Sequence, residues 1–276
     1  MEDILIAIHK LRVHFPVLSP FLRRVVGKIR AVDGVSFSIP KGKTLALVGE
    51  SGSGKTTLGR VLVGLQRATS GSVRYEDKEI TELRSKEFFP FRRKIQMVFQ
   101  DPYSSLNPKM RVQSIIEEPL EIHFPQMSPK ARRERVVDLL TKVGLAPSHI
   151  NRYPHEFSGG QRQRIGIARS LAVDPECIVC DEAVSALDVS IQAQILKLLQ
   201  DLQVEIGLTY LFITHDLAIV QQISDFVVVM HQGKVVEQGN TRDVYNNPGT
   251  WWQGWSLPSC WECCGNAQLG KAHSWP

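Results

Sequence analysis

A glycine-rich loop at residues 49–56 constrains the fold of this chain more than any other part of its sequence. The pattern G-x-x-x-x-G-K-[ST] is matched at every fixed position by the run Gly49, Glu50, Ser51, Gly52, Ser53, Gly54, Lys55 and Thr56. The short apolar run 44–48 before it is typical of a buried strand, and residues 56–65 after it have apolar side chains at helical spacing. A strand, this loop and a helix in that order predict a phosphate-binding turn in an α/β protein.

The loop has the chemistry that a nucleotide phosphate requires. Its glycines let successive backbone N–H groups approach phosphate oxygens, because no Cβ atom obstructs them. The helix that follows adds the partial positive charge of its N-terminus. Lys55 is expected to contact the β- and γ-phosphates, Thr56 to bind Mg²⁺ through its hydroxyl, and Thr57 to complete the nucleotide contacts. The alternative, a glycine-rich turn without a ligand, is disfavoured by the flanking strand and helix.

Strands and helices alternate along most of the chain, which favours a mostly parallel sheet in an α/β core. Apolar runs predict strands at 31–40, 44–48, 72–75, 94–99, 177–180, 210–213, 226–230 and 234–237. Helical spacing predicts helices at 56–65, 129–143, 161–172 and 191–204. The turn 231–233 predicts a hairpin. Residues 1–30 are expected to be irregular, because Pro16 and Pro20 interrupt any regular element.

Composition and charge exclude several classes of protein. Of the 276 residues, 43% are hydrophobic and 22% charged, which is typical of a folded domain and argues against disorder. The net charge of +5 is too small to indicate nucleic-acid binding by itself. Apolar runs such as 226–230 are strand-sized, and no leader opens the chain, so transport across a membrane by this chain alone is excluded. The sequence does not exclude attachment of the chain to membrane-spanning partners.

The five cysteines do not indicate a disulfide framework. Cys177 and Cys180 form a C-x-x-C pattern inside an apolar run, where buried small side chains are favoured over a redox or metal pair. Near the end of the chain lie three clustered thiols without a fourth ligand, which are weak evidence for a metal: Cys260, Cys263 and Cys264. All five tryptophans lie between residues 251 and 275, an abrupt change in composition.

Two acidic residues follow the apolar run 177–180. An acid at the carboxyl end of a buried parallel strand faces the ligand crevice of an α/β sheet. Asp181 is suited to a water-mediated contact with Mg²⁺, and Glu182 to activating the attacking water as a general base. The alternative is an ordinary solvated strand end, which the glycine-rich loop upstream disfavours.

A second small-residue loop precedes the helix expected at 161–172. Ser158, Gly159, Gly160 and Gln161 stand where a helix N-terminus could bind another phosphate. Ser-Gly-Gly is also common in linkers, so this loop is weak evidence taken alone. The run 162–169 that follows it makes the combination far more specific.

Over about residues 1–248, these motifs make the chain similar to the nucleotide-binding subunits of ATP-binding cassette (ABC) transporters. Residues 49–56 resemble the Walker A loop of that family, 177–182 its Walker B motif and 157–161 its signature motif. The resemblance implies an α/β P-loop NTPase (RecA-like) core with a small antiparallel β subdomain. It also implies an inserted α-helical subdomain at roughly 104–170, with ATP and Mg²⁺ as cofactors.

The resemblance extends to four further residues. Gln100 resembles the Q-loop glutamine that ligates Mg²⁺ and senses the γ-phosphate, and Asp188 lies in a segment that resembles the D-loop. His215 resembles the switch histidine that contacts the γ-phosphate; a histidine that ends an apolar strand is otherwise simply hydrogen-bonded. Phe15 is placed where the family has an aromatic side chain that stacks on adenine, although a lone phenylalanine beside a strand is more often part of a core.

Within the family, residues 31–37 and 99–108 are very similar to segments of oligopeptide and dipeptide importer ATPases. That branch implies a second related ATPase subunit, two transmembrane permeases and, indirectly, an external solute-binding protein, with no nucleic acid. The chain would then be peripheral, on the cytoplasmic face of the inner membrane, and would energise import of peptides or related solutes. The loop 101–110, with Tyr103 and Leu106, is expected to contact a permease helix. The alternative is an ABC-type ATPase accessory to a non-transport complex for phosphonate breakdown, DNA repair or ribosomes.

Two departures from the family pattern stand out. Ala183 and Val184 follow Glu182 where the family usually has Pro-Thr, and alanine is compatible with the same backbone. Residues 249–276 form an atypical tail where the resemblance ends, which suggests a truncation or a shifted reading frame. The spacing of the tail cysteines does not match that of cluster ligands in the family.

Overall fold

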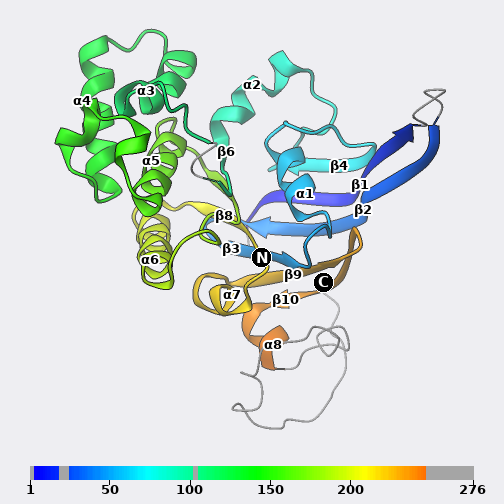
Figure 1. The fold of residues 1–276 in the computed structure, drawn as a ribbon. Coiled ribbons are helices and arrows are strands. Elements are labelled where there is room, and N and C mark those ends of the chain that lie inside the picture. Colours follow the sequence, from blue (N-terminus) through cyan, green and yellow to red (C-terminus); the bar gives the residue numbers. More distant parts are fainter. Residues whose placement is uncertain (1–2, 19–24, 102–104, 247–276) are drawn as a thin grey trace.

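The structure, a computed structural model, describes residues 3–18, 25–101 and 105–246. Its strands form two sheets, and a group of helices lies beside the larger sheet (Figure 1). This architecture confirms the predicted fold class, an α/β core with a small antiparallel sheet and an inserted group of helices. Tyr103, Pro20 and the tail 249–276, with its cysteines and tryptophans, lie outside the described residues.

The larger sheet has the strand order β10-β9-β3-β8-β7-β6. From β9 to β6 every neighbouring pair is parallel, whereas β10 pairs antiparallel with β9. The six strands agree with the sequence prediction and are β3 (Thr44–Gly49), β6 (Ile95–Val98), β7 (Cys177–Asp181), β8 (Thr209–Thr214), β9 (Phe226–His231) and β10 (Lys234–Asn240). The central strands β3, β7 and β8 are buried along their whole length, so their sequences are continuous apolar runs.

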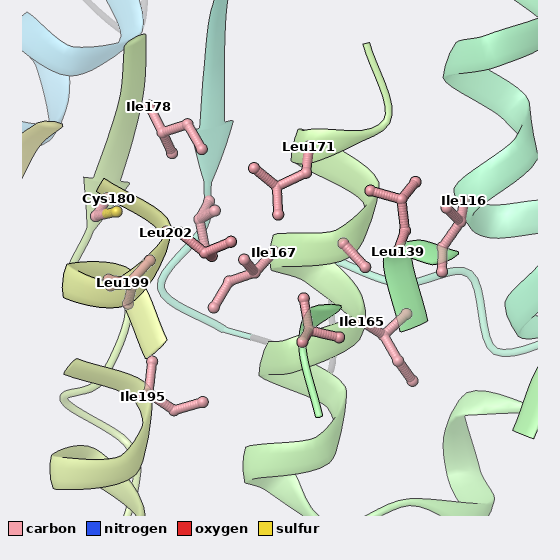
Figure 2. Packing of buried hydrophobic residues seen from close by; sticks show 14 of the residues in the cluster. Ile116, Leu139, Ile165, Ile167, Leu171, Ile178, Cys180, Ile195, Leu199 and Leu202 are labelled. Atoms are coloured by element: carbon pink, nitrogen blue, oxygen red, sulfur yellow. The ribbon is translucent and has the colours of Figure 1, made fainter. Parts of the chain in front are cut away.

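Helices cover both faces of this sheet. One face packs against α1 (Lys55–Leu62), and the other against α5 (Gly159–Leu171) and α6 (Val189–Ile206) (Figure 2). Side chains of β7 alternate between the two cores, with Cys177 on the side of α1 and Cys180 on the side of α5. Both thiols have 0% exposure, which confirms them as buried apolar residues, and burial raises the pKa of Cys177 to about 12.

The smaller sheet corrects one expectation. Its strands, in the order β2-β1-β4-β5, are β1 (Ile4–Leu18), β2 (Val25–Pro40), β4 (Ser70–Tyr75) and β5 (Lys78–Glu79). The prediction that residues 1–30 are irregular was therefore wrong. Pro16 is compatible with a strand there because β4 pairs with β1 only between Ile6 and Arg12, so β1 has a single neighbour at Pro16, opposite Lys28 of β2.

The remaining helices lie mostly between β4 and β7 in the sequence. They are α2 (Ser85–Lys94), α3 (Val112–His123), α4 (Pro129–Lys142), α7 (Leu217–Ile223) and α8 (Thr241–Asn246), with short 3₁₀ turns η1 (Pro147–Asn151) and η2 (Pro154–Glu156). Helix α4 begins at a capped end, since the Ser128 hydroxyl accepts a hydrogen bond from the Ala131 N–H at 3.3 Å. Among the described residues, no helix combines the length and apolar character needed to cross a membrane.

Candidate functional site

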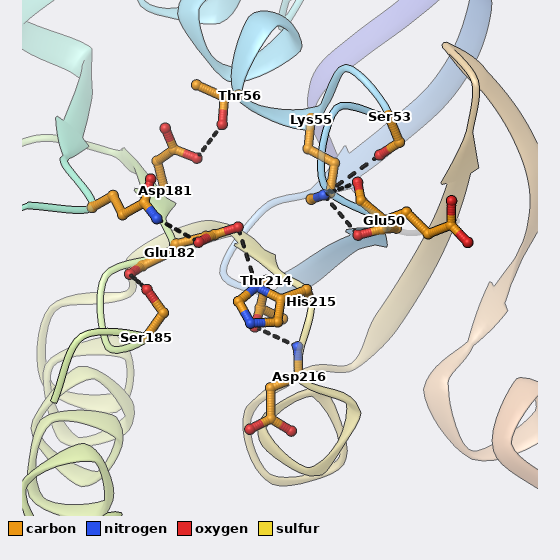
Figure 3. A network of polar contacts seen from close by, with 12 residues as sticks. Glu50, Ser53, Lys55, Thr56, Asp181, Glu182, Ser185, Thr214, His215 and Asp216 are labelled. Carbon is orange, nitrogen blue, oxygen red and sulfur yellow. Dashed lines mark hydrogen bonds and ion pairs between the residues drawn. The ribbon is translucent and has the colours of Figure 1, made fainter. Parts of the chain in front are cut away.

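The glycine-rich loop joins the buried strand β3 to helix α1, as its motif predicts (Figure 3). Lys55 is buried, and its Nζ donates hydrogen bonds to the carbonyl oxygens of Gly49 at 2.7 Å and Glu50 at 2.8 Å. Gly54 has φ +102°, and a Cβ there would lie 1.9 Å from the Ala31 carbonyl oxygen. No other residue fits this position, so the glycine is a requirement of the loop.

The tip of the loop is open. Ser51 is exposed, and a Cβ on Gly52 would meet no atom within 4 Å. Ser53 is buried, and its N–H donates to the Glu50 carbonyl oxygen at 3.1 Å, which curls the loop back on itself. Thr57 is half-buried in the first turn of α1.

A hydrogen bond joins the loop to the end of β7. Thr56 Oγ1 donates to Asp181 Oδ1 at 2.8 Å. Asp181 is 3% exposed, and this burial raises the pKa of its carboxyl; the Thr56 hydrogen bond lowers it, and the neighbouring Glu182 raises it further. Burial lowers the pKa of Lys55, while the nearby carboxylates of Glu182, Asp181 and Glu50 act in the opposite direction and raise it. The two motifs thus form one strongly charged, poorly solvated centre.

Glu182 lies at the meeting point of three strand ends (Figure 3). Gln100, which follows β6, donates from Nε2 to Glu182 Oε2 at 2.7 Å, and His215, which follows β8, has Nδ1 3.2 Å from Glu182 Oε1. The Glu182 side chain is 16% exposed. The carboxyl ends of parallel strands meet at one edge of a sheet, and here they bring Gln100 and His215 into contact with Glu182.

The backbone of Glu182 is left-handed, with φ +46°, which sequence reasoning did not anticipate. Its N–H donates to the Ile213 carbonyl oxygen at 3.0 Å, and its own carbonyl oxygen accepts from the Ser185 N–H at 3.1 Å and hydroxyl at 3.0 Å. These bonds hold a conformation that is unfavourable for a side chain with a Cβ. Glutamate is uncommon in it, so no local pattern in the sequence announces it.

The second small-residue loop is closed by a reciprocal pair of hydrogen bonds at the start of α5. Ser158 Oγ accepts from the Gln161 N–H at 3.4 Å, while Gln161 Oε1 accepts from the Ser158 N–H at 3.1 Å. A Cβ on Gly160 would lie 2.4 Å from the Ile191 side chain, and one on Gly159 would lie 3.3 Å from Leu187. The loop therefore packs against the start of α6. Helix α5 belongs to the core on the opposite face of the sheet from α1, so the structure does not join this loop to Lys55.

Asp188, the next predicted contact, is exposed at the N-cap position of α6. Its carbonyl oxygen accepts from the Gln192 N–H at 2.8 Å. Ala183 and Val184, the two departures from the family pattern, are each 2% exposed, and the Val184 carbonyl oxygen accepts from Gln192 Nε2 at 2.9 Å. The segment between Glu182 and Asp188 is thus packed and hydrogen-bonded.

Phe15 lies in β1 opposite Ile29, two residues from the Ala31 carbonyl that limits Gly54. Its side chain is half-buried and packs on the core shared by β1 and β2. Leu106 is 1% exposed and belongs to the core with α3 and α5, so its expected contact with a permease is wrong. The polar sequence around Leu106 suggests an exposed side chain, but in the structure Leu106 fills the core beneath the loop.

Sequence reasoning also missed a group of contacts around the turn between β9 and β10. The Gly233 N–H donates to the Ser53 carbonyl oxygen at 3.1 Å, and His231 Nδ1 lies 3.9 Å from Glu50 Oε2. No signal in the sequence distinguishes this turn from an ordinary hairpin.

A phosphate-binding loop bonded through a threonine hydroxyl to an acidic strand end, in a mostly parallel sheet, defines a P-loop nucleoside triphosphatase. A family model described as "ABC transporter" matches residues 32–185, more than half of the chain. The chain belongs to the ABC transporter family, and it is an ATPase of that family.

Named relatives agree with this assignment. The chain is 50% identical over 248 residues to the oligopeptide transport ATP-binding protein AppF of Bacillus subtilis (strain 168), covering 90% of this chain and 75% of that protein. It is 51% identical over 249 residues to OppF of Escherichia coli (strain K12), with coverage of 90% and 75%. It is 52% identical over 221 residues to the dipeptide transport ATP-binding protein DppF of Haemophilus influenzae, with coverage of 80% and 67%.

Solved structures share the fold. One is a dimeric ATP-binding cassette in a post-hydrolysis state bound to ADP and Pi, with a TM-score of 0.77, 29% identity and coverage of 86% of this chain and 99% of that one. Another is CbiO1 from Clostridium perfringens, part of an ABC transporter complex, with a TM-score of 0.75, 28% identity and coverage of 89% and 92%.

Proposed function

We propose that this chain is the ATP-binding and ATP-hydrolysing subunit that energises import of peptides or related solutes. The observation that carries the proposal is the Glu182 carboxylate, which is held between Gln100 and His215 and stands next to Asp181, itself bonded to Thr56. The names of the relatives AppF, OppF and DppF support peptides as the solute class. No observation on this chain favours a non-transport accessory role.

In this proposal the chain's own groups divide the work of hydrolysis. Backbone N–H groups of the P-loop and the Lys55 ammonium bind the β- and γ-phosphates, and Lys55 exchanges its bonds to two loop carbonyls for phosphate oxygens. Glu182 accepts a proton from the attacking water, while Gln100 and His215 orient its two carboxylate oxygens. Phe15 stacks on adenine. It pairs with Ile29 of β2, two residues before Ala31, whose carbonyl oxygen adjoins Gly54 of the loop.

The donors present fit Mg²⁺, since the Thr56 hydroxyl, the Asp181 carboxylate and the Gln100 amide all offer oxygen. These residues would hold the ion, Asp181 through water, and the ion would neutralise charge that develops on the phosphates. Among the described residues there is no group of three or more His, Cys, Asp or Glu suited to a metal, so phosphate oxygens would supply the remaining ligands.

The proposal includes a second ATPase. Ser158, Gly159, Gly160 and Gln161 lie at the start of α5, whose apolar side chains belong to the core on the face of the sheet away from α1 and Lys55. They would therefore bind the nucleotide of a related partner subunit, with Asp188 at the junction between the two subunits. The dimeric cassette among the similar structures supports this arrangement. We place the ATPase unit at residues 1–248, with its helical subdomain roughly at 104–170. Two permeases would anchor the pair at the cytoplasmic face of the membrane and receive solute from an external binding protein.

Reconstitution tests the proposal. The chain is co-expressed with a related ATPase and two permeases from the same genome, and the complex is placed in liposomes with ATP inside. A solute-binding protein and a labelled oligopeptide are then supplied outside. We expect uptake that requires ATP and that disappears in the Lys55→Ala complex. Equal uptake with and without ATP, or assembly with enzymes in place of permeases, would contradict the proposal.

A further inference from the structure

We infer that the turn between β9 and β10, residues 231–233, positions the P-loop for nucleotide, with Gly233 as the positioning residue. The inference rests on nucleotide binding at residues 49–56 and is independent of the solute. It follows from three sets of contacts that enclose the loop between this turn and β2.

The first contact is at the beginning of the loop. Strand β9 runs parallel to β3, and Met230 pairs with Gly49. A Cβ on Gly49 would lie 2.2 Å from the Met230 carbonyl oxygen, so the two backbones touch. The last residues of β9 therefore determine where the loop leaves the sheet.

The second contact is in the middle of the loop. The Gly233 N–H donates to the Ser53 carbonyl oxygen at 3.1 Å, two residues before Lys55. Ser53 in turn lies 3.4 Å, Oγ to Nζ, from the Lys55 ammonium, and its N–H closes the loop on the Glu50 carbonyl oxygen at 3.1 Å. A displacement of Gly233 would thus reach the residues that bind phosphate. The partly exposed His231 and Glu50 pair, at 3.9 Å, adds a weaker tie.

The third contact fixes the turn itself. The Gly233 carbonyl oxygen accepts from the Asp33 N–H at 2.7 Å, and the Asp33 carboxylate binds side chains from both β1 and β2, namely Arg12, His14 and Arg30. The Ala31 carbonyl oxygen would lie 3.0 Å from a Cβ on Gly233 and 1.9 Å from one on Gly54. The segment 30–33 therefore adjoins both the turn and the P-loop, and links them.

Only glycine satisfies both demands at position 233. Gln232 and Gly233 have φ +47° and +79°, the two left-handed residues of a type I′ hairpin turn. A Cβ on Gly233 would lie 2.8 Å from the Arg30 carbonyl oxygen, which is backbone and cannot swing away. A side chain at position 233 must therefore displace the turn. Because the Gly233 N–H is hydrogen-bonded to the Ser53 carbonyl oxygen, Ser53 would be displaced as well.

The test compares Gly233→Ala with Gly207→Ala in the purified chain. Gly207 has φ +69° at the end of α6, and a Cβ there would meet nothing within 4 Å, so this control introduces the same backbone strain without the contact. A third variant, Gly233→Asn, suits the left-handed backbone better but still adds the Cβ. Melting temperature, the Kd of a fluorescent ATP analogue, and KM and kcat for ATP are measured for each.

We expect both alanine variants to melt at lower temperature than wild type. The Kd and KM should rise about tenfold or more in both Gly233 variants, since displaced phosphate contacts are sensitive to shifts below 1 Å, and should stay within about twofold in Gly207→Ala. The kcat should change less than KM, because Glu182, Gln100 and His215 follow other strands. A folded Gly233→Ala with wild-type Kd, a Gly207→Ala as weak as it, or failure of both Gly233 variants to fold would overturn the inference. Absence of nucleotide binding in wild type would instead refute the proposed function.

Discussion

Glu182 holds a left-handed backbone at the point where its carboxylate meets Gln100 and His215. A non-glycine residue in such a conformation costs on the order of 1 kcal/mol or more, and such costs gather at functional sites. Hydrogen bonds from Ser185 to its carbonyl oxygen and from its N–H to the Ile213 carbonyl oxygen maintain the conformation. The strain turns the side chain toward the other strand ends, where the water would stand.

Replacing Glu182 tests its proposed role as the general base. We expect Glu182→Gln to keep ATP binding and to slow turnover by roughly 10²-fold or more, because an amide of the same shape cannot accept the proton. Steady-state phosphate release and the Kd of an ATP analogue measure the two effects. Glu205→Gln is the matched control, since Glu205 is an exposed acid whose Oε1 lies 3.3 Å from the Lys142 ammonium. Turnover of Glu182→Gln near that of wild type would remove Glu182 from the role.

Asp181 predicts an opposition between stability and activity. Its pKa is raised by burial, so the folded chain binds a proton at this site more tightly than the unfolded chain, and ionised Asp181 destabilises the fold at neutral pH. Asp181→Asn removes that charge and still offers an oxygen to Thr56. We expect its Tm without nucleotide at pH 7 to rise above that of wild type, because the buried negative charge is gone.

The gain in Asp181→Asn should shrink as the pH falls through the folded-state pKa of Asp181, because the wild-type carboxyl then becomes neutral as well. Scanning calorimetry at several pH values follows this. ATP hydrolysis should be lost at every pH, since the proposed Mg²⁺ site would lose the Asp181 carboxylate. A lower Tm for Asp181→Asn than for wild type at pH 7 would contradict the assigned effect of burial.

Among the elements, α5 offers two glycines with opposite expectations. A Cβ on Gly160 would lie 2.4 Å from the Ile191 side chain, whereas one on Gly166 would meet nothing within 4 Å. Gly166→Ala should therefore stabilise the chain by about 0.5–1 kcal/mol, the difference in helix propensity. Gly160→Ala should push the start of α5 away from α6 and lower the ATPase activity of the assembled complex.

Denaturant unfolding and the ATPase rate of the complex separate the two glycine variants. Gly166→Ala serves as the control for activity, because it changes the same helix by the same group. The model of loop packing fails if Gly160→Ala leaves the rate of the complex unchanged, or if Gly166→Ala lowers that rate equally.

The elements also indicate how far the sequence could be interpreted. Strands β3, β7 and β8 were predictable because a strand buried on both faces needs a continuous apolar run. Helices α2 and α3 were not, because Pro90 and Pro119 lie inside them and proline normally ends a helix. Strand β1 was missed because proline normally interrupts a strand, and the sequence does not show that β1 has only one neighbour, β2, at Pro16.

In the candidate site, too, some features could be predicted from the sequence and others could not. The motif at 49–56 could be assigned because strand, loop and helix are consecutive, and Asp181 because it ends a recognisable strand. The left-handed backbone of Glu182 and the contact of Gly233 with Ser53 could not, because each depends on residues brought together only by the fold. Leu106 was misplaced because burial of a loop residue depends on what lies beneath it.

At the scale of the whole molecule, helices α1 and α5, which begin at the two proposed halves of a nucleotide site, pack on cores at opposite faces of the sheet. We therefore expect the isolated chain to be mostly monomeric and weakly active, and to gain activity when the related ATPase is added. Sedimentation velocity with and without ATP, together with phosphate release, measures both. A stable and fast homodimer without a partner would contradict the requirement for a second kind of subunit.

The mutual hydrogen bonds of Ser158 and Gln161 have a consequence for the rate of assembly. A loop that is already closed in the lone chain loses little conformational freedom when it meets another subunit. Encounter is then limited by diffusion and orientation, and slow ordering of the loop adds no delay. Nucleotide would then regulate how long the two subunits stay bound, rather than how fast they associate. Each hydrolysis event would promote dissociation, and the closed loop would be able to bind the other subunit again without rearrangement.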